Sequence, residues 1–450
     1  MSKLLNLIRF TNLNKWSVHL LTDNNLVFTD KYPTVYFKEF TKKGNIEKVK
    51  IEDNKTYKIL GVRTYGLGVF LNREVLGSTL TMKTYQQVKK DHLFWCKVDT
   101  KNGGFGIVSD TLKDGLGSSN MAIAELDLSK INTDYLQLFF KSKRFNSYMD
   151  NLVVGTTNRK YIKFNDLLND IKIPLPSLDI QNKIVKGYHD KLDLSVSQEQ
   201  QAQEKEKKIE EYLYKELGIE ISDINNTNLL NFVKFRNIER WDIQANSFNL
   251  NDIKSSYEFI KIKKLIKKSQ YGLSEKANLN SNNTPMLRMN NIKNGQLDIN
   301  DLKYIDLNNK KLENYILNKN DIVFNRTNSK ELVGKCAVFN LFDTYTFASY
   351  LIRLKLDLEL INPNYFAIIL NSFIGRKQIN AISRQITGQV NVNAEELKNF
   401  VIPFPNLNIQ NMIVDYIQNI NDEIKELKNQ SLKNKTSALI EFEKEIFNEA

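Results

Sequence analysis

The chain has 450 residues, of which 41% are hydrophobic and 26% charged, a composition that is ordinary for folded protein and excludes wholesale disorder. Its 64 Lys and Arg against 52 Asp and Glu give a net charge of +12, the direction expected of a protein that neutralises phosphates, although A·T-rich coding bias produces the same sign. Two distant cysteines, Cys96 and Cys336, and the lack of any run of eighteen apolar residues predict no disulfide framework, zinc site, export signal or membrane span, which fits the cytoplasm.

The first half of the chain predicts a mostly β module that leads into a long helix. The runs Tyr57 to Val62 and Ile107 to Ser109 are short, rich in β-branched or aromatic residues and bounded by turn residues, which is typical of strands. The block Ile-Pro-Leu-Pro-Ser-Leu-Asp-Ile-Gln-Asn-Lys-Ile-Val follows at 173 to 185. A helix is predicted from there, with an apolar seam that starts at Ile180, Ile184, Tyr188 and Leu192, and Gly218 is a suitable end for it.

The second half repeats the first in the same order. Segment 231 to 241 matches 6 to 16 at an offset of 225, with Phe10/Phe235, Asn12/Asn237 and Trp16/Trp241 identical. The Pro-x-Pro block returns at 402 to 414, at an offset of 229. Between these blocks, strands are predicted at 321 to 324 and 336 to 339, and 131 to 135 corresponds to 361 to 365. Two matched blocks at nearly one offset indicate a tandem duplication.

The last helix shows the clearest periodicity in the chain. No Gly or Pro follows Asn406, and the residues Ile413, Ile417, Ile420, Ile424 and Leu427 step by four and three, which is the seam of a coiled coil. Periodicity alone favours a stalk or a dimerisation device. Since two such helices follow two equivalent modules, we expect them to pack antiparallel on each other, and roughly 38 residues of helix span about 57 Å, on the order of one and a half turns of B-DNA.

These features predict an α+β protein with two tandem, mixed but mostly β modules, each followed by a long helix, the two helices forming an antiparallel coiled coil. The predicted boundaries are 1–178 for the first module, 179–218 for its helix, 219–406 for the second module and 407–450 for its helix. Ile184, Tyr188, Leu192, Ile413, Ile417, Ile420, Ile424 and Leu427 are the predicted helix and partner interface.

The sequence lacks the constellations that would predict catalysis. Its three histidines, His19, His92 and His189, are not at metal-ligand spacing, and no P-loop, GxGxxG, HExxH or GxSxG occurs. Asn362-Pro363-Asn364-Tyr365 is similar to the adenine-holding loop of amino-methyltransferases, but no Gly-rich cofactor turn precedes it. A turn that enters a helix explains both this segment and its counterpart at 131 to 135. We therefore expect a non-catalytic chain without its own cofactor or metal.

Polar side chains suited to DNA are scattered over both modules. Arg and Asn can bond guanine and adenine edges through two hydrogen bonds, and Lys or Tyr can hold phosphates, although a solvated surface role is the commoner one for any single residue. The candidate DNA-binding residues are Arg63, Tyr65, Arg73, Lys83, Lys97, Lys101, Asn102, Arg288, Asn290, Asn291, Lys293, Arg326, Asn328, Lys330 and Lys335.

Nearly the whole chain resembles the specificity (S) subunit of type I restriction-modification systems. Those subunits carry two target recognition domains, each ending in an Ile-Pro-x-Pro-x-Leu-x-x-Gln-x-x-Ile-like block and a long helix. Here the block runs from Ile173 to Ile184 and from Ile402 to Ile413, and Gln385-Ile386-Thr387-Gly388 with Asn391 looks like the family's Thr-Gly…Asn element.

The resemblance implies that each half reads one part of a split DNA target and that the helices set the gap. It also implies partners: double-stranded DNA, two modification subunits that use S-adenosylmethionine to methylate adenine, and restriction subunits that use ATP and Mg. The competing hypothesis is a coiled-coil scaffold that binds protein instead of DNA, which predicts no salt-sensitive DNA affinity. A further hypothesis is that the segment before Trp16 packs on the C-terminal helix and closes a ring.

Overall fold

The computed structural model describes residues 28–42, 44, 46–97, 103–152, 164–221, 253–306, 312–329, 332–382, 384–386 and 389–447. It divides into two compact units, a first unit of Met1–Glu199 with Lys428–Ala450 and a second unit of Gln200–Leu427. The two long helices, α5 (Leu178–Leu217) and α11 (Leu407–Ile446), each contribute one part to each unit. The predicted boundaries of the modules themselves stay a prediction.

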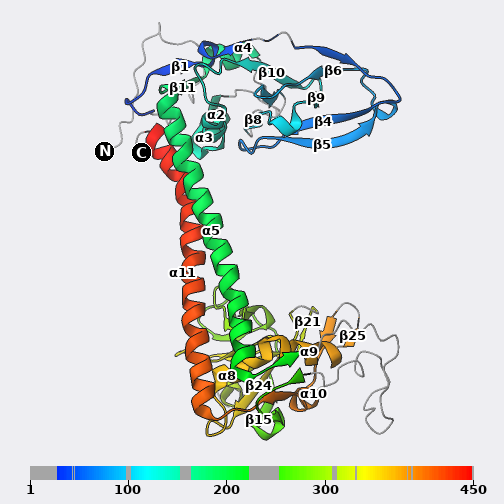
Figure 1. The fold of residues 1–450 in the computed structure, drawn as a ribbon, viewed down its shortest axis with the longest axis vertical. Helices are drawn as coiled ribbons and strands as arrows, with labels where there is room; N and C mark the ends of the chain where they lie inside the picture. The colour runs from blue at the N-terminus through cyan, green and yellow to red at the C-terminus, as the bar shows by residue number, and fades with distance from the viewer. Residues whose placement is uncertain are drawn as a thin grey trace. The chain divides into compact units, whose positions relative to one another are not determined.

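The first unit is mostly β (Figure 1). Its strands are β1 (Thr34–Tyr36), β2 (Thr41–Lys42), β3 (Lys48–Lys50), β4 (Thr56–Val62), β5 (Val69–Leu76), β6 (Thr84–Gln87), β7 (Leu93–Cys96), β8 (Phe105–Ile107), β9 (Leu116–Gly117), β10 (Met121–Leu126) and β11 (Lys172–Pro174). Besides the long helices it holds α2 (Thr133–Lys141), α3 (Lys143–Leu152) and α4 (Phe164–Asp170), and the short 3-10 turns η2 (Phe37–Glu39), η3 (Gly77–Thr79) and η5 (Asp110–Leu112).

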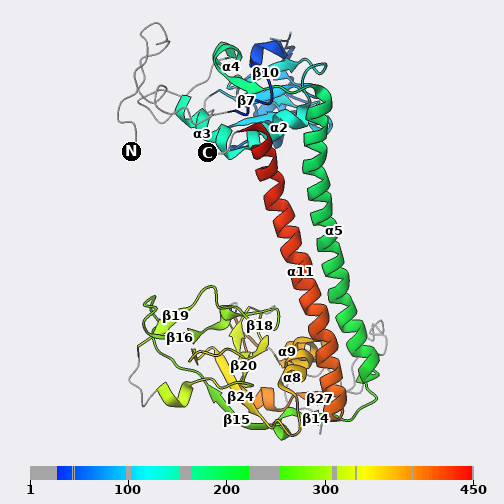
Figure 2. The same ribbon diagram turned by 90° about the vertical axis from the view of Figure 1, so that its left-hand side faces the viewer.

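The second unit has the same plan with more small sheets (Figure 2). Its strands are β12 (Glu220–Ile221), β13 (Ile253–Lys254), β14 (Phe259–Lys261), β15 (Ile266–Tyr271), β16 (Thr284–Leu287), β17 (Ile292–Lys293), β18 (Gln296–Leu297), β19 (Lys303–Ile305), β20 (Ile322–Asn325), β21 (Thr327–Asn328), β22 (Cys336–Val338), β23 (Thr346–Phe347), β24 (Leu351–Leu356), β25 (Arg384–Ile386), β26 (Gln389–Asn391) and β27 (Val401–Pro403). Its other helices are α8 (Pro363–Asn371), α9 (Phe373–Ile382) and α10 (Ala394–Lys398), with 3-10 turns η8 (Ile262–Lys264), η9 (Met289–Asn291) and η10 (Glu313–Tyr315).

A four-stranded antiparallel sheet forms the centre of each unit, and the strand order is equivalent. The first unit has the order β2-β10-β7-β8 and the second β15-β24-β20-β22. In the second unit α8 and α9 lie between this sheet and α11 (Figure 2), and Phe324, Phe366 and Ile413 share one buried core. The predicted duplication and the mixed, mostly β character of the modules are therefore confirmed.

The two units differ in what is inserted between the common strands. The first unit carries a five-stranded sheet of order β3-β6-β9-β4-β5 with its own small core around Ile59, Tyr85 and Leu116. The second unit instead carries a three-stranded sheet of order β19-β16-β23 and the hairpin of β17 and β18. These insertions hold most of the candidate DNA-binding residues.

Gln181 joins α5 to the module that precedes it. Its side-chain amide is fully buried and donates to the carbonyls of Lys130 and Pro176 at 2.9 and 2.7 Å. Its side-chain oxygen accepts the backbone NH of Asn132 at 2.8 Å. Because buried polar groups must be hydrogen-bonded, this glutamine fixes the start of the helix against the turn before α2.

Gln410 makes the same three contacts in the second unit. It is also fully buried, donates to the carbonyls of Leu360 and Pro405, and accepts the backbone NH of Asn362 at 2.8 Å. The repeated Pro-x-Pro block is thus the joint between each module and its helix, and its glutamine is the polar centre of that joint.

In both units α5 and α11 pack antiparallel, as predicted. The seam residues Ile413, Ile417, Ile420 and Ile424 are at most 8% exposed, while Ile184, Tyr188, Leu192 and Leu427 are half-buried. In the second unit Ala202, Ile420 and Ile424 form an apolar cluster. In the first unit, by contrast, the buried hydroxyls of Ser195 and Ser431 lie 2.8 Å apart.

The C-terminus of α11 is tied to the start of the described chain within the first unit. Phe28 and Phe447 form a β-bridge and stack at a centroid distance of 5.5 Å, and the NH of Thr29 donates to the carbonyl of Ile446 at 3.0 Å. The end of α5 has a matched contact in the second unit, since the NH of Ser256 donates to Leu217 at 3.0 Å. Gly218, with φ +56°, ends α5 as predicted. The segments 6–16 and 231–241 lie outside the described residues, so the ring hypothesis stays a prediction for the part before Trp16.

Candidate nucleic-acid interface

Arg326 in the second unit is the best-prepared of the candidate arginines. It follows β20 directly, and its guanidinium carbon lies 4.8 Å from the centroid of the Tyr271 ring. The backbone on both sides is fixed, because its NH donates to the carbonyl of Tyr350 and its carbonyl accepts from Val392. The Nε of Arg326 is buried and has no hydrogen-bond partner among the described residues. A guanidinium stacked on an aromatic ring is pre-organised for bidentate contacts.

A small sheet of order β21-β26-β25 lies next to Arg326. The Thr327 hydroxyl lies 3.1 Å from the side-chain oxygen of Asn391, and the side-chain oxygen of Asn328 accepts the NH of Ser329. The amide of Asn391, the asparagine of the Thr-Gly…Asn element, therefore helps to hold the strand that follows Arg326. Asn328 lies in the short strand β21.

The loop after β16 uses its polar side chains internally. Arg288 is 19% exposed at its side chain and forms an ion pair with Asp301 at 3.1 Å, and Lys293 pairs with Asp298 at 2.5 Å. Hydrogen bonding to Lys293 lowers the pKa of Asp298. Asn291, only 1% exposed, bonds three backbone groups of the same loop, so its side chain holds the loop together; Asn290 is exposed.

In the first unit, Arg63 lies at the base of the hairpin between β4 and β5. Its guanidinium carbon is 5.2 Å from the centroid of the Phe70 ring, and its side chain is exposed. Tyr65 at the tip has φ +57° and is 59% exposed, an unusual combination for a bulky residue. Gln137 anchors this tip by donating to the carbonyl of Gly66 at 2.7 Å. The tip is therefore fixed on α2 while its side chains face solvent.

The remaining candidates of the first unit differ in how their charge is used. Arg73 is exposed on β5, and among the described residues it forms no ion pair with an acidic residue. Lys83 forms an ion pair with Asp53 at 2.6 Å. Lys97 is half-buried, and its backbone NH donates to Asn120.

Four candidates remain, namely Lys101, Asn102, Lys330 and Lys335. Lys101, Asn102 and Lys330 are outside the described residues, as are Thr387 and Gly388. Lys335 is half-buried, and its carbonyl accepts the NH of Asn325, one residue before Arg326. Arg326, Asn328 and Lys335 thus belong to one neighbourhood of the second unit, whereas Arg288 to Lys293 belong to a separate loop.

Two stretches of the chain, 27–211 and 254–434, match the family of the type I restriction modification DNA specificity domain. The chain belongs to this family. The two matches follow the duplication seen in the sequence, and each includes one central sheet and one Pro-x-Pro joint.

Curated members of the specificity-subunit family are distant in sequence. The chain is 26% identical over 198 residues to the putative type I restriction enzyme MjaX specificity subunit of Methanocaldococcus jannaschii, covering 44% of this chain and 45% of the relative. It is 24% identical over 295 residues to the type I restriction enzyme EcoKI specificity subunit of Escherichia coli, covering 64% and 59%. The matches therefore span about half to three fifths of the length of these relatives.

Solved structures of the family share the fold. The HsdS subunit from Thermoanaerobacter tengcongensis matches with a TM-score of 0.53 and 12% identity, covering 95% of this chain and all of that one. A chain from a structure titled as the basis of complex assembly and conformational transition of the type I R-M system matches with a TM-score of 0.58 and 13% identity, covering 93% and 97%.

The segment that resembles a methyltransferase loop has a structural explanation in this specificity-domain fold. Asn362 caps α8, since its side-chain oxygen accepts the NH of Asn364 at 2.8 Å, and the Tyr365 hydroxyl is buried and donates to the carbonyl of Pro403. In the first unit Asn132 caps α2 in the same way and Tyr135 donates to Pro174. Both segments therefore form a turn that leads into a helix, α8 in the second unit and α2 in the first. Within the described ranges there is no cluster of metal-ligating side chains and no helix apolar enough over eighteen residues to cross a membrane.

Sequence reasoning missed the side chains that hold the candidate arginines. Tyr271 and Phe70 lie under Arg326 and Arg63, and Gln137 anchors the hairpin tip. Tyr271 is 55 residues before Arg326 in the chain. No local pattern links the two, because their proximity arises from the pairing of β15 with β24 and of β24 with β20.

Proposed function

We propose that this chain is the DNA-reading specificity subunit of a type I restriction-modification complex. Each unit reads one half of a bipartite, double-stranded target, and the chain directs adenine methylation and cleavage that partner subunits carry out. The observation that carries the proposal is the pair of family matches, each of which holds an arginine over an aromatic ring, Arg63 over Phe70 and Arg326 over Tyr271. Within the described part of the chain neither arginine has an acidic partner.

This distribution of charge suits contacts with DNA bases better than a nonspecific electrostatic attraction to the DNA backbone. Arg288, Lys293 and Lys83 are paired with carboxylates, so their charge is largely compensated. Arg63 and Arg326 keep their charge available and their side chains oriented, which is what a bidentate contact to guanine requires. We assign base reading to these two, and phosphate contacts to Arg73 and Lys335.

The chemistry of the complex belongs to its partners in this proposal. Two modification subunits that bind S-adenosylmethionine methylate the target adenines, and restriction subunits that use ATP and Mg join them. The chain itself recognises the target sequence. The antiparallel helices set the gap between the two half-sites, because α5 and α11 both extend over 40 residues.

The test is a genome-wide map of methylated adenines from cells that co-express the full chain and its modification subunit. We expect one bipartite motif with a fixed gap. Arg326→Ala should relax one half of the motif and Arg63→Ala the other half, because each removes a contact in only one unit. Lys83→Ala, which removes a cation already paired with Asp53, is the matched control and should leave both halves unchanged.

Two results would contradict the proposal. Methylation without any sequence motif, with DNA affinity that does not fall as salt is added, would favour a scaffold that binds protein. Relaxation of the same half-site by both arginine variants would show that the two units do not read separate halves.

A further inference from the structure

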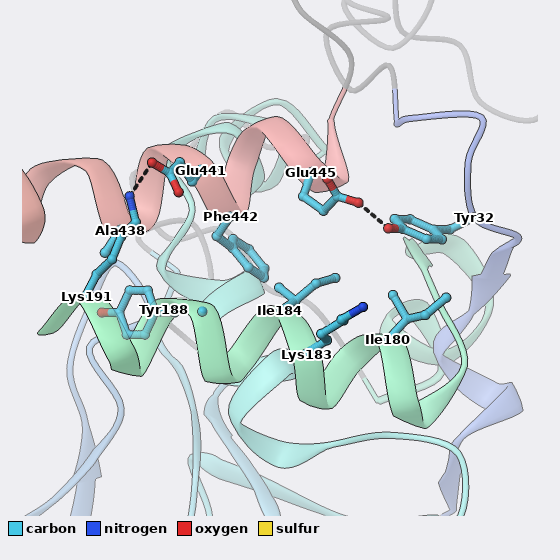
Figure 3. A pocket seen from close by; sticks show the side chains of 11 residues that line it. Tyr32, Ile180, Lys183, Ile184, Tyr188, Lys191, Ala438, Glu441, Phe442 and Glu445 are labelled. Carbon is cyan, nitrogen blue, oxygen red and sulfur yellow. Dashed lines mark hydrogen bonds and ion pairs between the residues drawn. The ribbon is translucent and has the colours of Figure 1, made fainter. Parts of the chain in front are cut away.

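A groove opens between the start of α5 and the end of α11 in the first unit (Figure 3). Its volume is about 450 Å³. Ile184 and Tyr188 line its α5 side and Phe442 its α11 side, and Figure 3 shows these apolar side chains facing one another. Gly187 lies in the wall, and a methyl group added there would meet no atom within 4 Å. We call this space the first groove.

The matched place in the second unit is filled by the chain itself. At the offset of 229 that relates α5 to α11, Gly187 corresponds to Tyr416, and Glu441 corresponds to Tyr212. The rings of Tyr212 and Tyr416 stack there with centroids 3.7 Å apart. The duplication therefore supplies its own comparison: where one copy places a tyrosine ring, the other has a glycine and an open space.

A glycine in the interior of a long helix needs a reason. Glycine is the poorest helix former after proline, and it is usually kept where a neighbour approaches closely. A Cβ added at Gly187 would meet no atom of a neighbouring element within 4 Å among the described residues, so a close packing contact inside this chain does not explain the glycine. Access for a group from outside the chain does.

The charges around the groove define what that group carries. Lys191 is paired with Glu441, and Glu445 accepts a hydrogen bond from Tyr32, whose pKa is raised to about 12 by burial and by that carboxylate. Lys183 is exposed, lines the same groove and forms no ion pair with an acidic residue among the described residues. The unpaired charge of Lys183 favours a group from outside the chain that carries a carboxylate.

We propose that the first groove is a docking site for a partner protein that inserts an aromatic side chain next to an acidic residue. The ring takes the place that Tyr416 fills in the second unit, and the acid meets Lys183. The inference rests on the part of the proposed function that gives this chain partner subunits, and it makes the two units unequal as docking sites.

A protein from outside the chain fits better than the other occupants. The segments 6–16 and 231–241 match each other, so a role in filling a groove would be needed in both units, yet the second groove is already occupied by Tyr416. A small molecule would contact only the residues that line the groove and would not explain exposed apolar residues beyond it. The same helices also expose Leu194, Val196, Leu432 and Ile440 in the first unit, at 49 to 63% exposure, which indicates a wider protein contact.

The experiment uses the full chain and a capped tripeptide probe, acetyl-Ala-(3-fluorotyrosine)-Asp-amide, followed by fluorine NMR. We expect a dissociation constant at or below about 1 mM, the range for a small ligand that buries one ring. Gly187→Tyr, which copies the second unit, should weaken binding about 10-fold or more because it fills the space. Gly187→Ala is the matched control and should bind within about twofold of the original chain.

Lys183→Met, which copies Met412 of the second unit, tests the acid. It should weaken the Asp probe about threefold or more and leave an Asn probe unchanged. A probe with Ala in place of the fluorotyrosine, labelled at its acetyl group, needs no variant and should not bind.

The proposal is overturned if the original chain does not bind the tyrosine probe at 10 mM, if Gly187→Tyr binds it equally well, or if the Ala probe binds as tightly. Salt-dependent DNA binding by the same preparations separates this result from the proposed function. That binding should be equal for the original chain and for Gly187→Tyr, and its loss in both would count against DNA reading instead.

Discussion

The two units keep the same joint between module and helix but differ in what lies between their helices. Gln181 and Gln410 make three matched hydrogen bonds each. The helix seam, in contrast, is apolar around Ala202 and Ile424 in the second unit and polar around Ser195 and Ser431 in the first. The two copies therefore share the hydrogen bonds that attach each module to its helix, whereas the residues between the paired helices differ.

The largest expected effect comes from removing the shared joint. Gln410→Ala would leave the buried carbonyl of Pro405 and the part-buried carbonyl of Leu360 and NH of Asn362 without this partner. We therefore expect the second unit to lose about 3 kcal/mol of its free energy of unfolding. Gln181→Ala should do the same to the first unit. Native-state hydrogen exchange, assigned to each unit, measures both losses.

Gln203→Ala removes an exposed glutamine of α5 and is the control. The expected change in the free energy of unfolding is within about 0.5 kcal/mol. A loss of similar size in both units from either single variant would contradict the idea of two separate joints.

The next largest effect concerns DNA affinity in the second unit. Arg326→Ala should weaken binding to the cognate duplex by about 1 to 3 kcal/mol, because it removes a pre-oriented guanidinium. Arg288→Ala, in which the lost cation was paired with Asp301, should have a smaller effect. Fluorescence anisotropy at one fixed salt concentration compares the two, and a larger loss for Arg288→Ala would refute the assignment.

The polar seam predicts a smaller, non-additive effect. Ser431→Ala should cost the first unit about 1 kcal/mol, because the Ser195 hydroxyl is left buried without its partner. Combining it with Ser195→Ile copies the Ala202 and Ile424 pair of the second unit and should restore at least the original stability. Urea unfolding of the original chain, the two single variants and the double variant gives the coupling free energy between the two positions. If the losses of stability are additive, the hydroxyl pair does not stabilise this part of the helix seam.

The smallest expected effect is a difference between the two units in how their stability depends on pH. His92 corresponds to Asp321 at the offset of 229, and both are buried. Burial lowers the pKa of His92 below the ordinary value of 6.5, so the folded state disfavours its charged form and stability is lost as the pH falls through 6.5. The slope is at most about 1.4 kcal/mol per pH unit for one proton.

Burial raises the pKa of Asp321, so the stability that its protonated form contributes is instead lost as the pH rises above 3.8. As the pH falls below 6.5, we therefore expect His92→Asn to flatten the pH dependence of unfolding of the first unit. The variant keeps an acceptor for the Lys89 NH, which the ring nitrogen of His92 accepts at 3.2 Å. A dependence that persists unchanged in the variant would assign it to other groups.

Much of this fold could be predicted because it is encoded locally. The seam from Ile413 to Leu427 has a period that only a helix can bury on one side, and Gly218 adopts the positive φ that ends α5. The runs at 57–62 and 321–324 became β4 and β20 because β-branched and aromatic residues favour strands. One local expectation was wrong: Ile180 is 38% exposed at the mouth of the first groove and is not part of the buried seam.

The sequence by itself determined the duplication, the two helices, the Pro-x-Pro joints and the family, since repeats and periods are properties of residue order. Only the tertiary structure decided which cations are paired, because the partners of Arg288, Lys83 and Arg326 are brought to them by loop and strand pairing. It also decided that Gly187 faces an open groove while Tyr416 fills the matched one. Such facts depend on contacts between residues far apart in the chain, and no local pattern records them.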